Sequence, residues 1–503
     1  MRRLAAPTRA LPLDAFRALV GLLALGYCVR QLVDVPLYWA PDGVMAHSTS
    51  RELYGFTWQP LFHPTMSAPG FFAIFGLGCA LSVAIVIGLM PRASALLLYL
   101  IVVCGYRFNF LLLFIDDVVV HLLLFWVALL PVGTTLTLAS LCRDGPGIWA
   151  RWRERQVPGA TLRLFLGNLV LLYAVAGTTK WGSPLWLSGD ALYATLKLPC
   201  SWFADEVGPG HLPLLRILDY AALVLEPLFA LGLCLPARGA LRWALAAGLL
   251  AFHLGITVTL DVPFANLGCL TALPLIFRGG SSREKPERTL DSPGRFELRA
   301  SERFALFVFT LLVGAMICSA LQGQWRQPRL AGSAGAVSEV PGSTRETGGP
   351  VQTALYAALW TLGLAQQYRL LDWIDERNFH VKTTFHVWPL DGTPRRATPV
   401  DSILPRGMRS GLLLSYLGGV TWMPVPPGGQ APLRKALGAR IGQRFCRAAM
   451  ADEDVLLEAD YERVDPRRPT PREHIPLAAF RCTRAGEALP LSPGMIPSSH
   501  AVP

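Results

Sequence analysis

Residues 93–113 read ASALLLYLIVVCGYRFNFLLL and residues 118–141 read VVVHLLLFWVALLPVGTTLTLASL, and these two stretches decide the fold class of the chain. The first carries a single charged side chain, Arg107, and the second carries no Asp, Glu, Lys or Arg. A helix of about twenty apolar residues crosses roughly 30 Å of hydrocarbon. The two stretches therefore predict neighbouring membrane-spanning helices.

Similar apolar runs continue on both sides of this pair. They predict nine spans, at about 14–38, 71–90, 93–114, 118–141, 161–178, 214–235, 239–260, 263–277 and 303–321. The eighth range is the weakest candidate because it is short and contains Pro263 and Pro274.

The composition agrees with this interpretation and argues against a soluble protein. Of 503 residues, 52% are hydrophobic and only 16% are charged, which is too little charge to cover a soluble surface. The formal net charge of +11 does not indicate nucleic-acid binding, because much of the Lys and Arg lies in short loops beside the apolar runs. In those loops, basic residues set the orientation of a membrane protein.

The distribution of basic residues predicts the topology. With a cytoplasmic N-terminus, nineteen Lys and Arg residues fall on the cytoplasmic side of the nine spans up to residue 303. Six fall on the opposite side, namely Arg30, Arg51, Arg107, Lys180, Lys197 and Arg216. This asymmetry favours a multi-pass integral membrane protein whose C-terminal part lies outside the cytoplasm.

The chain changes character after the last predicted span. Residues 12–321 form the transmembrane domain, and residues 322–350 read as a Gly-, Ser- and Pro-rich linker. Residues 351–485 contain alternating stretches at 379–387 and 455–461 and a turn at Asp391-Gly392, and residues 486–503 read as a loose tail. The predicted fold is an all-α polytopic bundle of about nine helices with a small β-rich extracytoplasmic domain.

The ten cysteines give no sign of a metal site, because none forms a CxxC pair. Cys446 and Cys482 lie in the polar C-terminal part. They are able to form a disulfide if that part is extracytoplasmic and brings them close together.

Lys180 is the first candidate for chemistry. It follows the fifth predicted span directly, after the small residues 176–179, which would let another helix come close. Burial favours the neutral amine, which can act as a base. The competing interpretation is a lysine that reaches the membrane interface beside an aromatic anchor, Trp181.

A second candidate group lies between the third and fourth predicted spans. It consists of Arg107, Asn109, Asp116, Asp117 and His121. The last two are four residues apart and share a helix face. The group is either a polar site at the outer membrane edge or a solvated connecting turn.

The third candidate is His253, in an apolar helix with Asp261 two turns later. A lone histidine in such a helix is more often a bridge between helices than a catalyst. Glu226 and Pro227 lie inside the sixth span, where a buried carboxyl needs a partner and the proline implies a kink.

Four of these stretches resemble segments of the horizontally transferred transmembrane (HTTM) domain family, which includes the vitamin K-dependent gamma-carboxylases. They are residues 176–193 around Lys180, residues 14–17, the segment 107–126 and residues 252–254. The resemblance extends over about residues 12–320, and it rests on the order and spacing of these four stretches.

The resemblance implies a membrane-embedded, carboxylase-like or lyase-like enzyme, typical of bacterial inner membranes. It implies a reduced quinone resembling vitamin K hydroquinone as cofactor, with Lys180 as its base and His253 as a second catalytic residue. The polar group at residues 107–121 and Trp181 would bind the quinone or the substrate. Eukaryotic carboxylases carry an Asn-His pair where this chain has Asp116-Asp117, so glutamate carboxylation itself does not follow.

Two other functions remain open at this stage. The same region distantly resembles the lipase maturation factors, which would make the chain a non-enzymatic helper of secreted proteins. A transporter is the third hypothesis, although the sequence shows no internal repeat. The expected partners are the lipid bilayer and a secreted polypeptide, with no nucleic acid. An enzyme should need the amine of Lys180, whereas a maturation factor should tolerate arginine there.

Overall fold

The computed structural model describes most of the chain apart from the termini and several connecting segments. The described residues are 6–45, 47, 50, 59–145, 147–234, 239–276, 300–321, 379–391, 393–417, 430–464 and 472–491. The predicted linker 322–350, residues 351–378 and residues 492–503 of the predicted tail lie outside them.

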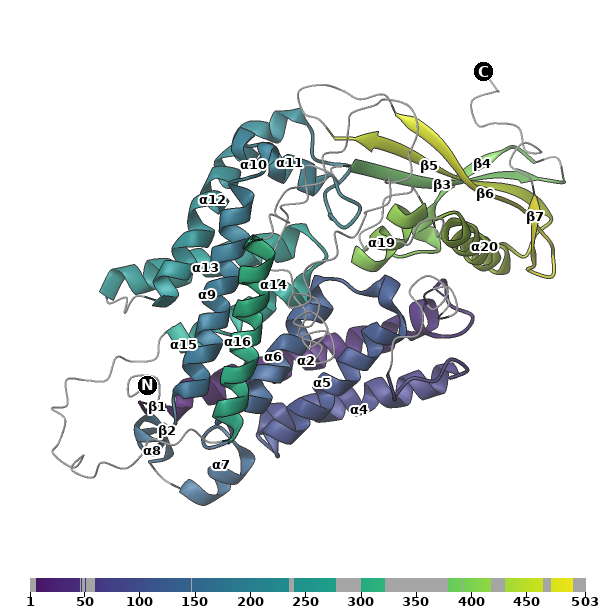
Figure 1. Ribbon diagram of the computed structural model, residues 1–503. Coiled ribbons are helices and arrows are strands. Elements are labelled where there is room, and N and C mark those ends of the chain that lie inside the picture. The colour runs from purple at the N-terminus through teal and green to yellow at the C-terminus, as the bar shows by residue number, and fades with distance from the viewer. Residues whose placement is uncertain are drawn as a thin grey trace, which may run out of the picture.

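The N-terminal two thirds form a helical bundle (Figure 1). Its long helices are α2 (Ala10–Asp34), which continues as η1 (Val35–Trp39), α4 (Ala68–Ile87), α5 (Pro91–Phe108), α6 (Ile115–Leu129), α9 (Ala160–Lys180), α12 (Leu212–Cys234), α13 (Gly239–Thr259) and α16 (Ala300–Leu321). Its short helical segments are η2 (Phe110–Leu112), α7 (Leu138–Asp144), α8 (Ile148–Glu154), α10 (Pro184–Ser188), α11 (Ala191–Leu196), η3 (Pro209–His211), α14 (Pro263–Leu270) and α15 (Leu273–Ile276). Two short strands, β1 (Thr8–Arg9) and β2 (Gln156–Val157), pair antiparallel near the N-terminus.

Among the described residues, four helices are long and apolar enough to cross a membrane. They are Ala10–Trp39, Ala68–Ile87, Pro91–Phe108 and Ala160–Lys180. A helix overlaps each of the nine ranges predicted as spans. Several of these helices are shorter or more charged than the four, so the count of nine stays a prediction.

Two predicted spans have different boundaries from those expected. The fourth range was predicted to run to residue 141, but α6 ends at Leu129. Leu130 is extended because Pro131 follows it, and a residue before proline disfavours the helical region. The eighth range is divided into α14 and α15. Pro263 occupies the first turn of α14 and Pro274 lies in α15.

The C-terminal domain, residues 379–491, is built on a five-stranded antiparallel sheet of order β4-β3-β5-β6-β7. Its elements are β3 (Phe379–Pro389), β4 (Arg396–Pro399), η4 (Val400–Ser402), α19 (Met408–Leu417), α20 (Gln430–Ala449), β5 (Glu453–Arg463), β6 (Glu473–Cys482) and β7 (Ala488–Leu491). The two predicted strands coincide with β3 and β5, and Asp391 lies in the predicted turn. The sheet extends to Leu491, so the tail does not begin at residue 486 as predicted.

A disulfide joins Cys446 of α20 to Cys482 of β6. Their Cα atoms lie 5.0 Å apart, within the range that a disulfide requires. α20 can pack closely on β6 because it presents glycines to the strand. A Cβ at Gly438 would lie 2.9 Å from the side chain of Ala478, and one at Gly442 would lie 2.8 Å from Phe480.

The bundle and the C-terminal domain pack against each other through shared buried residues. The domain boundaries at residues 321 and 351 stay predictions. One hydrophobic core runs from Trp39 and Phe108 in the bundle to Phe385 and Phe445 in the C-terminal domain. All ten residues of α19 are buried, and this helix lies between the sheet and the bundle in Figure 1. Side chains of α19 therefore reach the interior of the bundle.

Candidate active site

Lys180 is the last residue of α9, and its side chain is buried with 1% of its surface exposed. Its Nζ donates to Oε2 of Glu226 on α12 at 2.5 Å and to the carbonyl of Ala176 at 3.3 Å. The amine also lies 5.2 Å from the ring centroid of Trp186. It does not reach an aqueous surface, so the structure does not support the interfacial anchor.

The close contact between α9 and α12 has two local causes. Gly177 lies against Pro227, and a Cβ at this glycine would lie 2.7 Å from the proline Cδ. Pro227 has no N–H, so the carbonyl of Leu223, four residues earlier, loses its helical partner. Trp181 donates its indole N–H to this carbonyl at 3.2 Å. The small residues before Lys180 thus permit the close packing that the sequence predicts.

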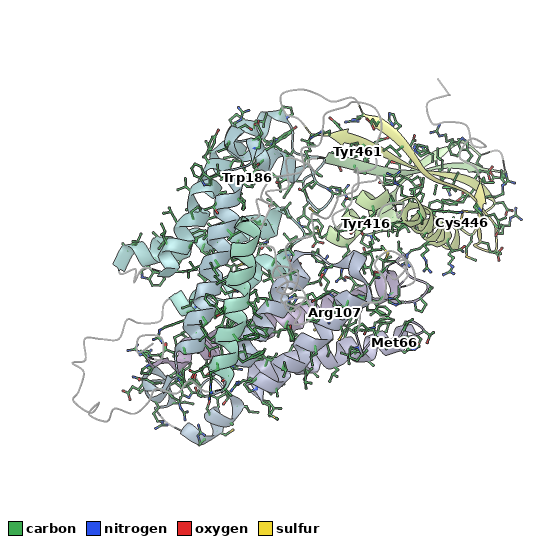
Figure 2. All side chains as sticks on the ribbon, in the orientation of Figure 1. Met66, Arg107, Trp186, Tyr416, Cys446 and Tyr461 are labelled. Carbon is green, nitrogen blue, oxygen red and sulfur yellow. A yellow bond between two sulfur atoms is a disulfide. The ribbon has the colours of Figure 1, made fainter. Side chains whose placement is uncertain are left out.

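Trp181 does not take the predicted place beside the candidate base. Its side chain is 53% exposed, and its indole N–H donates to the Leu223 carbonyl of α12. The ring that faces the amine belongs to Trp186, which is 1% exposed on α10. Figure 2 shows Trp186 close to α10 and α12, at the end of the bundle near the sheet.

His253 bridges three helices near this pair. Its Nε2 lies 2.7 Å from the hydroxyl of Tyr173 on α9, and its Nδ1 lies 2.9 Å from Oδ1 of Asn266 on α14. The amide of Asn266 donates to the Val262 carbonyl, which turns Oδ1 towards the histidine. Nδ1 therefore donates and Nε2 accepts from Tyr173. Both ring nitrogens have partners, so the structure favours the bridging role over the catalytic one.

The two aspartates after α5 lie in a second buried polar cluster. Asp117 accepts hydrogen bonds from the hydroxyl of Tyr27 at 2.5 Å and from the backbone N–H of Phe114 at 3.1 Å. Asp116 accepts from the backbone N–H of Ala265 at 2.7 Å, at the start of α14. A helix N-terminus favours a carboxylate at this position. Oδ2 of Asp116 is buried and has no hydrogen-bond partner among the described residues.

Arg409 of α19 closes this cluster from the C-terminal domain. Its guanidinium contacts Asp34 at 2.5 Å and Asp117 at 3.6 Å, and the side chain is 3% exposed. Burial opposes its charged form, but the carboxylates of Asp34 and Asp117 outweigh this effect and raise the pKa of Arg409. The arginine therefore stays charged and compensates the two acids.

A second ion pair lies beside the first. Arg30 donates to both carboxylate oxygens of Asp261, at 2.8 and 2.6 Å. Asp261 also accepts from the backbone N–H of Met408 at 2.7 Å, directly before Arg409. The same turn of α19 is thus fixed to α2 and to the segment between α13 and α14.

The other predicted members of this group, His121, Arg107 and Asn109, are also buried. His121 donates from Nδ1 to the carbonyl of Asp117 at 2.9 Å and lies near the rings of Tyr99 and Tyr106. Arg107 lies in the last turn of α5 and is 8% exposed, and Asn109 is the C-cap residue of this helix and is 1% exposed. Figure 2 shows Arg107 well apart from Trp186. The group is buried, which excludes the solvated turn, but it does not converge on Lys180.

α14 connects the two polar clusters. Ala265 binds Asp116, and the adjacent Asn266 binds His253. A series of buried polar groups therefore leads from Arg409 and Asp117, past α14, to His253 and Tyr173 on α9. This arrangement links three predicted site residues, Asp116, Asp117 and His253, whereas Lys180 pairs separately with Glu226.

Several members of the site were not predicted as site residues. The carboxyl of Glu226 was expected to need a partner, and the structure supplies Lys180. Tyr27, Arg30 and Asp34 follow helical spacing inside an apolar run, a signal that could have identified them. Arg409 lies 375 residues from Asp34, and no local pattern marks it.

Within the described part of the chain, no three His, Cys, Asp or Glu side chains gather where they could hold a metal ion. Comparison with protein-family models, curated proteins and solved structures gives no match. The chemistry of the site therefore has to be inferred from its own geometry.

Proposed function

We propose that this chain is a membrane-embedded, carboxylase-like enzyme in which Lys180 takes a proton from a lipid-soluble quinol. The observation that carries the proposal is the buried contact of 2.5 Å between Nζ of Lys180 and Oε2 of Glu226. Charged groups are rare in apolar helices, and those that occur commonly serve function.

The pair gives the amine the properties of a general base. In the base form of the pair, Oε2 of Glu226 would hold the shared proton, which leaves Nζ an uncharged amine with a free lone pair. When Nζ takes a proton from a substrate hydroxyl, the carboxyl group of Glu226 stabilises the ammonium that forms. The anion left on the substrate then balances the new positive charge, which limits the cost of charge in an apolar environment.

The surroundings fit a flat, apolar substrate with a weakly acidic hydroxyl. Trp186 presents its ring to the amine, and Tyr173 of α9 and His253 of α13 form a buried polar pair. α12 exposes Leu218, Val224 and Leu231, by 46%, 52% and 55%, so an apolar surface lies on the helix that carries Glu226. Molecular oxygen would be the oxidant of the reduced quinone, and this oxidation would drive the modification of a second substrate.

The proposal extends to the location of the protein. The four apolar helices and the asymmetric basic residues support a multi-pass protein of a bacterial inner membrane. The disulfide supports an extracytoplasmic C-terminal domain, because disulfides persist in oxidising compartments. The second substrate would then be a secreted polypeptide or a small molecule on that side.

Oxygen uptake and quinone absorbance, measured on the purified protein with vitamin K hydroquinone as the probe, test this function. Lys180→Arg should lower the rate by about 10²–10⁴-fold, because guanidinium cannot act as a base. Lys382→Arg is the matched control, because this lysine is exposed on β3 and should leave the rate unchanged.

A second variant separates catalysis from folding. Lys180→Gln/Glu226→Gln removes both charges together, which buried pairs tolerate better than the loss of one partner. This variant should fold and lack activity. Full activity in folded Lys180→Arg or in the double variant would reject the catalytic role and favour a maturation factor. An absence of quinol turnover by the wild-type protein would reject the quinol.

A further inference from the structure

An open groove of about 810 Å³ lies between α20 and the chain that follows η1. Arg440, Gln443, Arg444 and Arg447 line it from α20, and Asp42 and Ser402 lie across from them. We propose that this groove, here called the α20 groove, binds the phosphate of an anionic lipid headgroup. The proposal does not depend on the chemistry assigned to Lys180.

The charge of the groove favours an anion. Arg440, Arg444 and Arg447 recur at helical spacing and therefore share one face of α20. Among the described residues, Asp42 is the single carboxylate that lines the groove, and it lies 4.0 Å from Arg447 with both side chains more than half exposed. Arg444 contacts no carboxylate among the described residues. Three guanidinium groups thus face one acid.

Arginine suits a phosphate better than lysine does. Its planar fork can donate two parallel hydrogen bonds to phosphate oxygens. Arg440 fixes the groove because its Nη1 donates to the carbonyls of Pro41 at 2.9 Å and Gly43 at 2.8 Å. Arg444 and Arg447 remain as the groups that would bind the ligand.

The position of the groove favours a lipid over an acidic peptide. Trp39 is the last residue of the first candidate span, and Asp42 lies three residues beyond it. Three extended residues reach at most roughly 11 Å. Hydrogen bonds from Gly43 to Ala40 and from Val44 to Leu37 fold the chain back towards the span. The groove therefore lies at the depth of the polar headgroups. These form a layer about 5 Å or more thick outside the hydrocarbon on each side of the bilayer.

The groove is also held in shape from behind. Gln443 donates to the Gly486 carbonyl at 2.7 Å and accepts from the Ala488 N–H at 3.2 Å. The disulfide of Cys446 joins the same turn of α20 to β6, and Figure 2 shows Cys446 on this helix. A site that is ordered before binding loses less conformational entropy when the ligand enters.

Native mass spectrometry of the full-length protein with phosphatidylglycerol and phosphatidylcholine tests the proposal. The wild-type protein should bind phosphatidylglycerol preferentially. Arg444→Gln/Arg447→Gln should weaken this binding by about 30-fold, because each basic residue near an anionic surface contributes about a factor of five. The matched control is Arg395→Gln/Arg472→Gln, which removes two exposed charges of the same domain outside the groove and should change nothing.

Thermal unfolding of each variant checks the fold. The four substituted arginines are exposed or half-buried, so all variants should fold. Equal binding of both lipids by the wild-type protein would overturn the proposal, as would unchanged binding in the groove variant. Displacement of the lipid by glycerol phosphate at equal concentration would assign the site to a free phosphate instead. Tighter binding of a glutamate-rich peptide, lost in the groove variant, would assign it to an acidic polypeptide.

Discussion

Arg409 is the residue through which the C-terminal domain enters the buried acid cluster. It contacts Asp34 of α2 and Asp117 of α6, and Asp117 also holds the hydroxyl of Tyr27. Two carboxylates on different helices thus share one guanidinium. The arginine compensates the negative charge of both carboxylates, and a buried charge without a partner would destabilise the folded protein.

Arg409→Met should therefore destabilise the protein by about 3–5 kcal/mol, the cost of leaving buried charges uncompensated. Thermal unfolding in detergent measures the effect. Arg406→Met is the control: this arginine is 50% exposed in its pairs with Asp401 and Asp205, so its loss should cost about 1 kcal/mol or less. Asp117→Asn should recover part of the loss in Arg409→Met, and equal unfolding temperatures of the two arginine variants would contradict the account.

The sequence predicts single residues of the site better than their partners. Lys180 and Asp116 stand out because charge is rare in apolar helices, and that signal is local. The partner of Lys180 lies 46 residues away on another helix, and the ring that faces its amine is Trp186 and not the adjacent Trp181. Which side chains meet depends on helix packing, which sequence spacing does not specify.

At the scale of elements, the contact of α9 with α12 depends on Gly177. The Cβ of an alanine there would lie 3.0 Å or less from the backbone nitrogen and ring of Pro227, and both groups are rigid. Gly177→Ala should push the helices apart and strain the contact between Lys180 and Glu226. We expect a loss of about 1–3 kcal/mol in stability, as for overpacked interiors, and a lower quinol-dependent rate.

Gly255→Ala provides the matched control for this variant. Gly255 lies in α13, and no described atom lies within 4 Å of a Cβ built there. Alanine should be neutral or stabilise the helix by up to about 1 kcal/mol, because it has the higher helix propensity. If thermal unfolding shows the same temperature for both glycine variants, the helices do not depend on this close packing.

The helices and strands that the sequence predicts are those with a repeating local pattern. Apolar runs gave the ranges of the long helices, and alternation gave β3 and β5. The early end of α6 and the break between α14 and α15 arise at prolines inside apolar runs, where hydropathy alone does not mark a boundary. The position of α19 has no local signal, because its surroundings come from distant parts of the chain.

At the scale of the molecule, the prediction is a nine-span topology with the N-terminus in the cytoplasm and the C-terminal domain outside. It rests on the asymmetry of nineteen to six basic residues. Fusion of an alkaline phosphatase or a green fluorescent protein after residue 345 tests it, because the first is active outside the cytoplasm and the second inside. Fusions after residue 145 serve as the control and should report the cytoplasm. Fluorescence of the fusion after residue 345 would reject the count of nine.

The shared core has a consequence for the order of biosynthesis. Asp34 leaves the ribosome 375 residues before Arg409, and Tyr38 leaves 372 residues before its hydrogen-bond partner Ser410. At about 5–20 residues per second, the first helix waits roughly 20–75 s for these partners. During this interval the nascent helices hold an acid cluster without its arginine. The bundle can therefore reach its final packing only after α19 has been synthesised, and a chain truncated before α19 would be left as an unfinished intermediate.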